Sequence, residues 1–179
     1  MAPTASEVIA EIESVFPASR AVQFVPMANS LRGDEPQLTA EAFSDKEDWT
    51  ELDPHWLDEA PDGLASALNF LADEALCFYI PAYIVADLRG QLERSEPTFQ
   101  LTHGFDNFSR DQRIWSRNSE TWTDFAKARW SHLTRGQARA IVQYLEWRIN
   151  KDGREFAYPV QEALSGFWYH RASAEWKGS

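Results

Sequence analysis

Residues 68–88 read LNFLADEALCFYIPAYIVADL, and this stretch decides the fold class of the chain. It is the one long apolar segment in the sequence, and residues 75–86 carry no charge. Asp73 and Glu74 come immediately before them, where the helix dipole favours negative charge in a first turn. About a dozen uncharged residues are too few to span a bilayer, for which about 20 are needed. We therefore expect a buried core helix.

Pro81 lies in the middle of this expected helix. Proline has no backbone N–H, and its ring crowds the carbonyl four residues earlier, so a helix kinks or restarts at such a position. We expect a proline-kinked central helix that packs Phe78, Tyr79 and Ile84 in the core. Cys77 lies in the same segment and is expected to act as a small buried hydrophobe.

The same stretch carries a family resemblance. It resembles an uncharacterised family of small bacterial proteins, known only as a domain of unknown function, with the signature L-x-F-L-[ST]-P-E-A-x-x-[YF]-[YF]-L-P-A-Y-[LM]. The chain departs from this signature at Ala72 and Asp73, where the family has Ser or Thr followed by Pro. The resemblance implies a fold and a bacterial origin, but no activity. The matching residues are Leu68, Phe70, Leu71, Glu74, Ala75, Phe78, Tyr79, Ile80, Pro81, Ala82, Tyr83 and Ile84.

Length and composition favour one domain in the cytoplasm. The chain has 179 residues, which suits a single α-helical domain over residues 1–179, and a chain of this size buries about 70% of its surface on folding. One cysteine cannot form an intramolecular disulfide, and residues 1–7 lack the basic and apolar regions of a signal peptide. We therefore expect a cytoplasmic protein without cofactor, metal site or membrane association.

Capping patterns mark further helices. Thr4 with Glu7, and Thr134 with Gln137, match the box in which the N-cap hydroxyl and the third helical residue bond reciprocally, and apolar residues at helical spacing follow both. Weaker patterns predict short helices around residues 39–43 and 44–52, and longer ones over 64–71, 73–92 and 110–131, with a last helix from Tyr158. The sequence therefore predicts an all-α, single-domain bundle of six to eight helices and no convincing strand.

Charge is distributed unevenly along the chain. The net charge is −11, with 19 acids and 5 bases in residues 1–100 but 9 acids and 12 bases in residues 101–179. The densest stretch, residues 41–62, holds nine acids and one base, Lys46. A field of this sign repels nucleic acid and attracts basic surfaces. The expected partner is therefore a basic protein, in one form a toxin, and not a nucleic acid.

The acidic stretch has two interpretations that the sequence leaves about even. A run of charge is usually a solvated face. Alternatively, the acids steer a basic protein and the interleaved aromatic residues anchor it, although the same aromatics could be the buried side of amphipathic helices. The candidate partner-binding residues are Asp45, Glu47, Asp48, Trp49, Glu51, Asp53, Trp56, Asp58 and Glu59.

Two other clusters have simpler explanations. His55 precedes Asp58 and Glu59 at helical spacing, which permits a weak metal site, but an ion pair on a helix surface is the commoner outcome. A region rich in aromatic and basic residues resembles a surface for single-stranded nucleic acid, yet core aromatics with surface ion pairs are the stronger interpretation. Its members are Arg110, Arg113, Trp115, Arg117, Trp122, Lys127, Arg129 and Trp130.

No nucleotide-binding, nucleophile-elbow, zincin or CxxC motif is present, so no catalytic residue is assigned. The expected function is an acidic protein-binding module, in one form an immunity or antitoxin-like inhibitor that covers a basic site of its partner. One alternative is a small enzyme of unknown reaction whose pocket is lined by Tyr79 and Tyr83. A second alternative is a structural subunit that oligomerises through exposed tryptophans.

Overall fold

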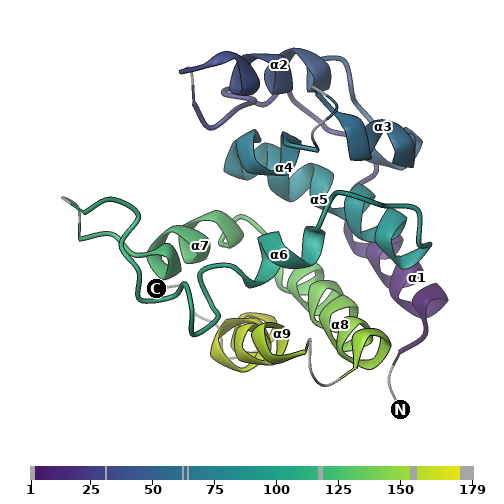
Figure 1. The fold of residues 1–179 in the computed structure, drawn as a ribbon. Coiled ribbons are helices and arrows are strands. Elements are labelled where there is room, and N and C mark those ends of the chain that lie inside the picture. Colours follow the sequence, from purple (N-terminus) through teal and green to yellow (C-terminus); the bar gives the residue numbers. More distant parts are fainter. Residues whose placement is uncertain are drawn as a thin grey trace. The chain divides into compact units, whose positions relative to one another are not determined.

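The protein is helical throughout the part of the chain that the structure describes. A computed structural model (Figure 1) describes residues 3–30, 32–61, 63, 65–116, 119–153 and 157–173. Within these ranges the backbone forms helices, turns and three isolated β-bridges, without a β-strand. The predicted all-α class is confirmed. None of the helices in these ranges combines the length and apolar character that a membrane span requires.

The chain divides into two compact units. The first, here called the terminal unit, joins Met1–Val15 to Thr98–Ser179, and the second, the middle unit, is Phe16–Pro97. The expectation of a single domain over residues 1–179 stays a prediction.

The middle unit is built around the helix expected from residues 68–88. This helix, α5, spans Asp73–Leu88, and twelve of its sixteen residues are buried. It continues without interruption through Pro81, so the proline does not restart it. Tyr79 and Ile84 are fully buried as expected, whereas Phe78 is only half-buried. An apolar character on all sides is typical of a helix in a protein interior.

Short elements surround α5 in the middle unit. They are α2 (Asp34–Phe43), a 3₁₀ turn (Trp49–Glu51), α3 (Pro54–Glu59) and α4 (Ala67–Phe70). Helix α2 begins five residues before the helix expected from Thr39, because Pro36 lies in its first turns, where a missing N–H costs nothing. The helix expected from Ser44 is not present: only the 3₁₀ turn forms, and residues 44–48 make a loop. Leu64, in the expected helix 64–71, lies outside the described residues.

The terminal unit pairs the first helix with the longest one. Helix α1 (Ala5–Val15) buries Val8 and Ile12 and packs against α8 (Arg135–Asp152), as Figure 1 shows. Both helices begin with the predicted reciprocal caps, Thr4 with Glu7 and Thr134 with Gln137. Gly153 ends α8 with a φ of 79°, a conformation that glycine adopts without strain.

The remaining helices of the terminal unit enclose aromatic residues. They are α6 (Pro97–Thr102), α7 (Trp122–Trp130), α9 (Tyr158–Ala163), a π-helical segment (Leu164–Trp168) and α10 (Tyr169–Ala172). Phe105 stacks on Phe167 with ring centroids 4.1 Å apart, and the Trp168 indole donates to the Leu101 carbonyl at 2.8 Å. Helix α7 is shorter than the expected helix 110–131, because Thr121 and Asp124 form a capping box that starts it at Trp122.

Candidate functional site

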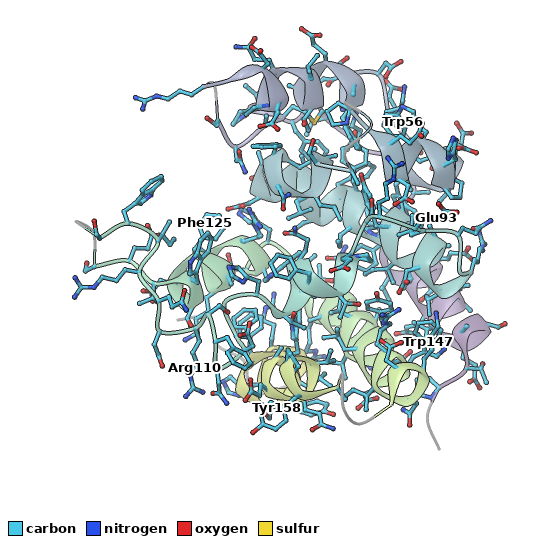
Figure 2. All side chains as sticks on the ribbon, in the orientation of Figure 1. Trp56, Glu93, Arg110, Phe125, Trp147 and Tyr158 are labelled. Atoms are coloured by element: carbon cyan, nitrogen blue, oxygen red, sulfur yellow. The ribbon has the colours of Figure 1, made fainter. Side chains whose placement is uncertain are left out.

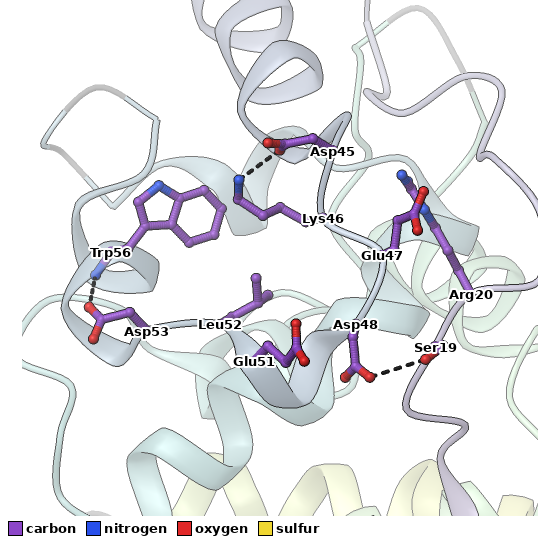
Figure 3. Close-up of a pocket in the computed structure, with 10 residues that line it drawn as sticks. All are labelled: Ser19, Arg20, Asp45, Lys46, Glu47, Asp48, Glu51, Leu52, Asp53 and Trp56. Atoms are coloured by element: carbon purple, nitrogen blue, oxygen red, sulfur yellow. Dashed lines mark hydrogen bonds and ion pairs between the residues drawn. The ribbon is translucent and has the colours of Figure 1, made fainter.

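An open pocket lies at the surface of the middle unit, over the loop after α2 and the start of α3. Its volume is about 760 Å³, and the close-up in Figure 3 shows the side chains around it. The residues that line it are Ser19, Arg20, Asp45, Lys46, Glu47, Asp48, Glu51, Leu52, Asp53 and Trp56.

Two aspartates fix the backbone on one side of the pocket. Asp48 caps the 3₁₀ turn, because its carboxylate accepts from the Thr50 backbone N–H at 2.8 Å and from the Ser19 hydroxyl at 3.0 Å. Asp53 caps α3 by accepting from the Trp56 backbone N–H at 2.9 Å. Each cap satisfies an N–H that would otherwise lack a partner at a helix start. The pocket wall is therefore held by the helix termini themselves.

A stack of aromatic rings joins the pocket to α5. The half-buried Trp56 ring lies 5.0 Å from the Phe43 ring, and Phe43 lies 4.8 Å from the Tyr79 ring in an edge-to-face contact. Figure 2 shows Trp56 where α3 approaches the end of α2. Phe43 and Tyr79 are fully buried. Such contacts add to the stabilisation by burial, so Trp56 presents a supported aromatic surface to the pocket.

The hydroxyl of Tyr79 holds the loop that carries the acids. It donates to the Lys46 carbonyl at 2.5 Å, and the Phe43 carbonyl lies 3.3 Å away. The Arg20 guanidinium donates to the same hydroxyl at 3.4 Å and to the Ser44 carbonyl at 2.6 Å. Burial raises the pKa of Tyr79 to about 12, so the hydroxyl stays protonated at neutral pH. The loop is thus tied to α5 by a neutral donor.

The two cations of the pocket already have partners. Arg20 is bound to the Tyr79 hydroxyl and the Ser44 carbonyl. The Lys46 ammonium lies 2.6 Å from a carboxylate oxygen of Asp45 and 5.2 Å from the centroid of the Trp56 ring. By contrast, the Glu47 and Glu51 side chains form no hydrogen bond or ion pair with any other described residue. Five carboxylates against two engaged cations leave the pocket negative.

Hydrogen bonds keep two of these acids, Asp45 and Asp48, ionised. The Lys46 ammonium, as the main influence, lowers the pKa of the Asp45 carboxyl. For Asp48, partial burial is the largest single influence and opposes ionisation, but hydrogen bonds from Thr50 and Ser19 together outweigh it and lower the pKa. Both groups are therefore charged at neutral pH.

Comparison with known proteins identifies the family but no function. The sequence pattern of a family described as "Family of unknown function (DUF6714)" matches residues 4–172. The chain belongs to this family. The expected resemblance to an uncharacterised family is thereby confirmed. No curated protein and no solved structure matches the chain.

In this DUF6714 protein the structure brings together six of the nine candidate partner-binding residues. The six line the pocket together with other residues, one of which is Leu52. They are Asp45, Glu47, Asp48, Glu51, Asp53 and Trp56. Their role in binding a partner stays a prediction.

The other three candidates do not line the pocket, and for two of them the structure corrects the predicted surface position. Trp49 is only 3% exposed, and its indole donates to the Pro17 carbonyl at 2.8 Å, so it is a core residue and not a surface anchor. Asp58 was expected on the surface but is 5% exposed. Glu59 is exposed but does not line the pocket; it pairs with His55 at 3.6 Å on the surface of α3.

Asp58 is buried because it holds a distant part of the chain. Its carboxylate accepts from the backbone N–H groups of Glu93, Arg94 and Ser95, at distances of 2.6 to 3.1 Å. Burial is the largest influence on its ionisation and opposes it, but these hydrogen bonds together lower the pKa. Asp58 is therefore an ionised structural group that fixes the segment after α5.

Pocket residues that sequence reasoning did not select are Ser19, Arg20, Lys46 and Leu52. Lys46 could have been selected from the sequence, because it is the one base among the acids of residues 41–62. Ser19 and Arg20 lie more than twenty residues earlier in a loop, and no spacing rule connects them to that stretch.

The structure also places the residues of the two other clusters. No group of three or more His, Cys, Asp or Glu side chains there could hold a metal ion. Of the region rich in aromatic and basic residues, Trp130 is fully buried and Arg129 is 7% exposed, whereas Arg110, Arg113, Trp115 and Lys127 are exposed. Arg117 lies outside the described residues. Trp130 and Arg129 are therefore core residues, as the interpretation of core aromatics expects for the tryptophan.

Proposed function

We propose that this protein is a binding module that receives a basic protein partner at the pocket of the middle unit. The observation that carries the proposal is the pair of exposed, unengaged carboxylates, Glu47 and Glu51, which line the same pocket as the supported Trp56 ring. Acidic groups speed the encounter with a basic surface, and an aromatic ring in a pocket supplies contact area that holds it.

The charge of the two units supports the same proposal. The middle unit holds 16 acids and 5 bases, a net charge of −11, whereas the terminal unit holds 12 of each. The whole excess of negative charge therefore belongs to the unit that contains the pocket. A field of this kind raises association rates with basic partners and discourages acidic ones.

One form of the proposal is an immunity or antitoxin-like inhibitor that acts in the cytoplasm and covers a basic site of a toxin. A lone buried cysteine suits a reducing compartment. The enzyme alternative with a pocket lined by Tyr79 and Tyr83 has less support, because both side chains are fully buried and neither lines the pocket.

The test is differential capture from a lysate of the source organism, read by quantitative mass spectrometry. The bait is the full chain, compared with the double variant Glu47→Lys/Glu51→Lys and with the control Glu35→Lys/Glu96→Lys, which makes the same charge change at exposed acids outside the pocket. We expect a basic protein on wild type and on the control, but not on the pocket variant. Equal capture by all three baits would contradict the proposal.

A further inference from the structure

The pocket already contains a cation of its own, in a defined position. The Lys46 ammonium lies 5.2 Å from the centroid of the Trp56 ring and 2.6 Å from the Asp45 carboxylate, as Figure 3 shows. A cation over an indole, with a carboxylate beside it, gains from both the ring quadrupole and the opposite charge. We propose that this position receives the guanidinium of an arginine side chain on the partner, which displaces the Lys46 ammonium.

This inference rests on the proposed function and names the group that the pocket recognises. Lys46 can leave because only its side chain occupies the position. Its backbone is fixed, since its carbonyl accepts from Tyr79 and its N–H donates to Phe43 at 3.2 Å. The ammonium has an ion pair with Asp45, in which the Asp45 side chain is 74% exposed and the Lys46 side chain 29% exposed. Water and salt reach the pair from the Asp45 side and compete with it, so its contribution to stability is small.

The pocket has carboxylates that the Lys46 ammonium does not bind and that a cation arriving from solvent can reach. Glu47 and Glu51 are exposed and form no hydrogen bond or ion pair with other described residues. Figure 3 shows Glu51 across the pocket from Asp45, so a cation that enters from solvent can meet carboxylates on both sides. A volume of about 760 Å³ admits a long side chain together with its backbone.

Arginine fits this arrangement better than lysine. Its planar guanidinium stacks on an aromatic face and donates two parallel hydrogen bonds to one carboxylate, whereas an ammonium is a compact, strongly hydrated charge. The Trp56 ring is supported by Phe43. A guanidinium between the Trp56 ring and the carboxylates can therefore stack on the ring and bind the carboxylates at the same time.

The first arm of the test uses a small probe and the full chain. The tripeptide acetyl-Gly-Arg-Gly-amide is titrated into ¹⁵N-labelled protein, and the shifts of the Trp56 indole and the Lys46 and Glu47 amides are followed by NMR. Matched peptides carry lysine, or citrulline, which keeps the shape of arginine without its charge. We expect saturable shifts with arginine, at least about threefold weaker binding with lysine, and none with citrulline.

The second arm uses variants that distinguish an effect at the Lys46 position from an effect of the protein's net charge. Lys46→Met frees the Trp56 face and Asp45, so the arginine peptide should bind about fivefold tighter. Lys127→Met, which makes the same charge change at an exposed position on α7, should leave the affinity within about twofold. Trp56→Leu and Glu51→Gln should each weaken binding by at least about threefold.

Two results would overturn the inference. One is an unchanged affinity of Lys46→Met, and the other is equal binding of the arginine and citrulline peptides. If the captured partner still depends on Glu47 and Glu51 while the arginine peptide ignores the pocket, the inference fails and the proposed function stands. If the peptide binds as expected but all three baits capture equally, the proposed function fails instead.

Discussion

Two tyrosines one helical turn apart on α5 have opposite environments. Both side chains are fully buried, but Tyr79 bonds to the Lys46 carbonyl, whereas the Tyr83 hydroxyl has no hydrogen-bond partner among the described residues. Burial, and then the charge of Asp58, raise the pKa of Tyr83, so it remains a neutral phenol. The pair therefore provides a matched comparison of one hydroxyl with a partner and one without.

Tyr79→Phe should lower the free energy of unfolding by about 1–2 kcal/mol, because it leaves the Lys46 carbonyl without its donor. Tyr83→Phe should change it by less than about 0.5 kcal/mol or stabilise the protein, since it removes a buried hydroxyl without a partner. Urea unfolding followed by circular dichroism measures both. Equal losses for the two variants would show that the Tyr79 hydroxyl does not hold the loop.

Asp58→Asn should lower the free energy of unfolding by about 1–3 kcal/mol at pH 7, because an amide accepts less strongly from the three N–H groups than a carboxylate. The pKa of Asp58 is lower in the folded state than in the unfolded chain. Its charge therefore stabilises the fold above about pH 4, and this contribution is lost as pH falls through the folded pKa.

Urea unfolding of wild type and Asp58→Asn across pH 3 to 7 checks this prediction. The difference between the two proteins should shrink as the solution is acidified. A difference that stays constant over the whole range would mean that the carboxylate charge contributes nothing.

At the scale of elements, the turn between α6 and α7 depends on one glycine. Gly104 has a φ of 90°, and a Cβ there would lie 2.5 Å from the Trp122 carbonyl oxygen, at the start of α7. Gly104→Ala should therefore lower the free energy of unfolding by about 2–4 kcal/mol. The matched control is Gly153→Ala at the end of α8, where φ is 79° but no described atom lies within 4 Å. Gly153→Ala should lower the free energy of unfolding by about 1 kcal/mol. Thermal unfolding measures both variants, and equal losses of stability would contradict a close contact between residue 104 and the Trp122 carbonyl.

The elements that the sequence predicts well are those with local signals. Thr4 and Thr134 start α1 and α8 through bonds to residues three positions away, so a short pattern contains the whole cause. The predicted helix 110–131 is longer than α7, because the residues before Trp122 form turns that the local sequence pattern does not reveal. There, Asp106 accepts from the Ser109 hydroxyl and from the backbone N–H groups of Phe108 and Ser109, which forms a turn instead of a helix.

The candidate site shows the same division between local and distant causes. The density of acids in residues 41–62 is visible in the sequence alone. Most of the candidate residues chosen from it line the pocket. Sequence spacing could not show which side of a one-turn element faces inward, so Trp49 was placed outside. Asp58 has its partners 35 to 37 residues away, in a loop that no pattern connects to α3.

For the whole molecule, the middle unit is negative, whereas the terminal unit carries no net charge. Attraction between opposite charges acts before contact and therefore changes the association rate, and salt screens it over a distance of about 8–10 Å. A ring that anchors a partner acts after contact. Trp56→Ala should therefore raise the dissociation rate of the captured partner by at least about tenfold and leave its association rate nearly unchanged. Surface plasmon resonance separates the two rates, and a slower association with unchanged dissociation would contradict an anchoring role.

The association rate of the same partner is the most direct measure of whether the pocket acids steer it. It is measured by surface plasmon resonance at low and high salt for wild type, Glu47→Lys/Glu51→Lys and the control Glu35→Lys/Glu96→Lys. We expect the pocket variant to associate at least about tenfold more slowly than wild type at low salt, the control to change far less, and the three rates to converge at high salt. Association of the pocket variant at the wild-type rate in low salt would show that these acids are only a solvated surface.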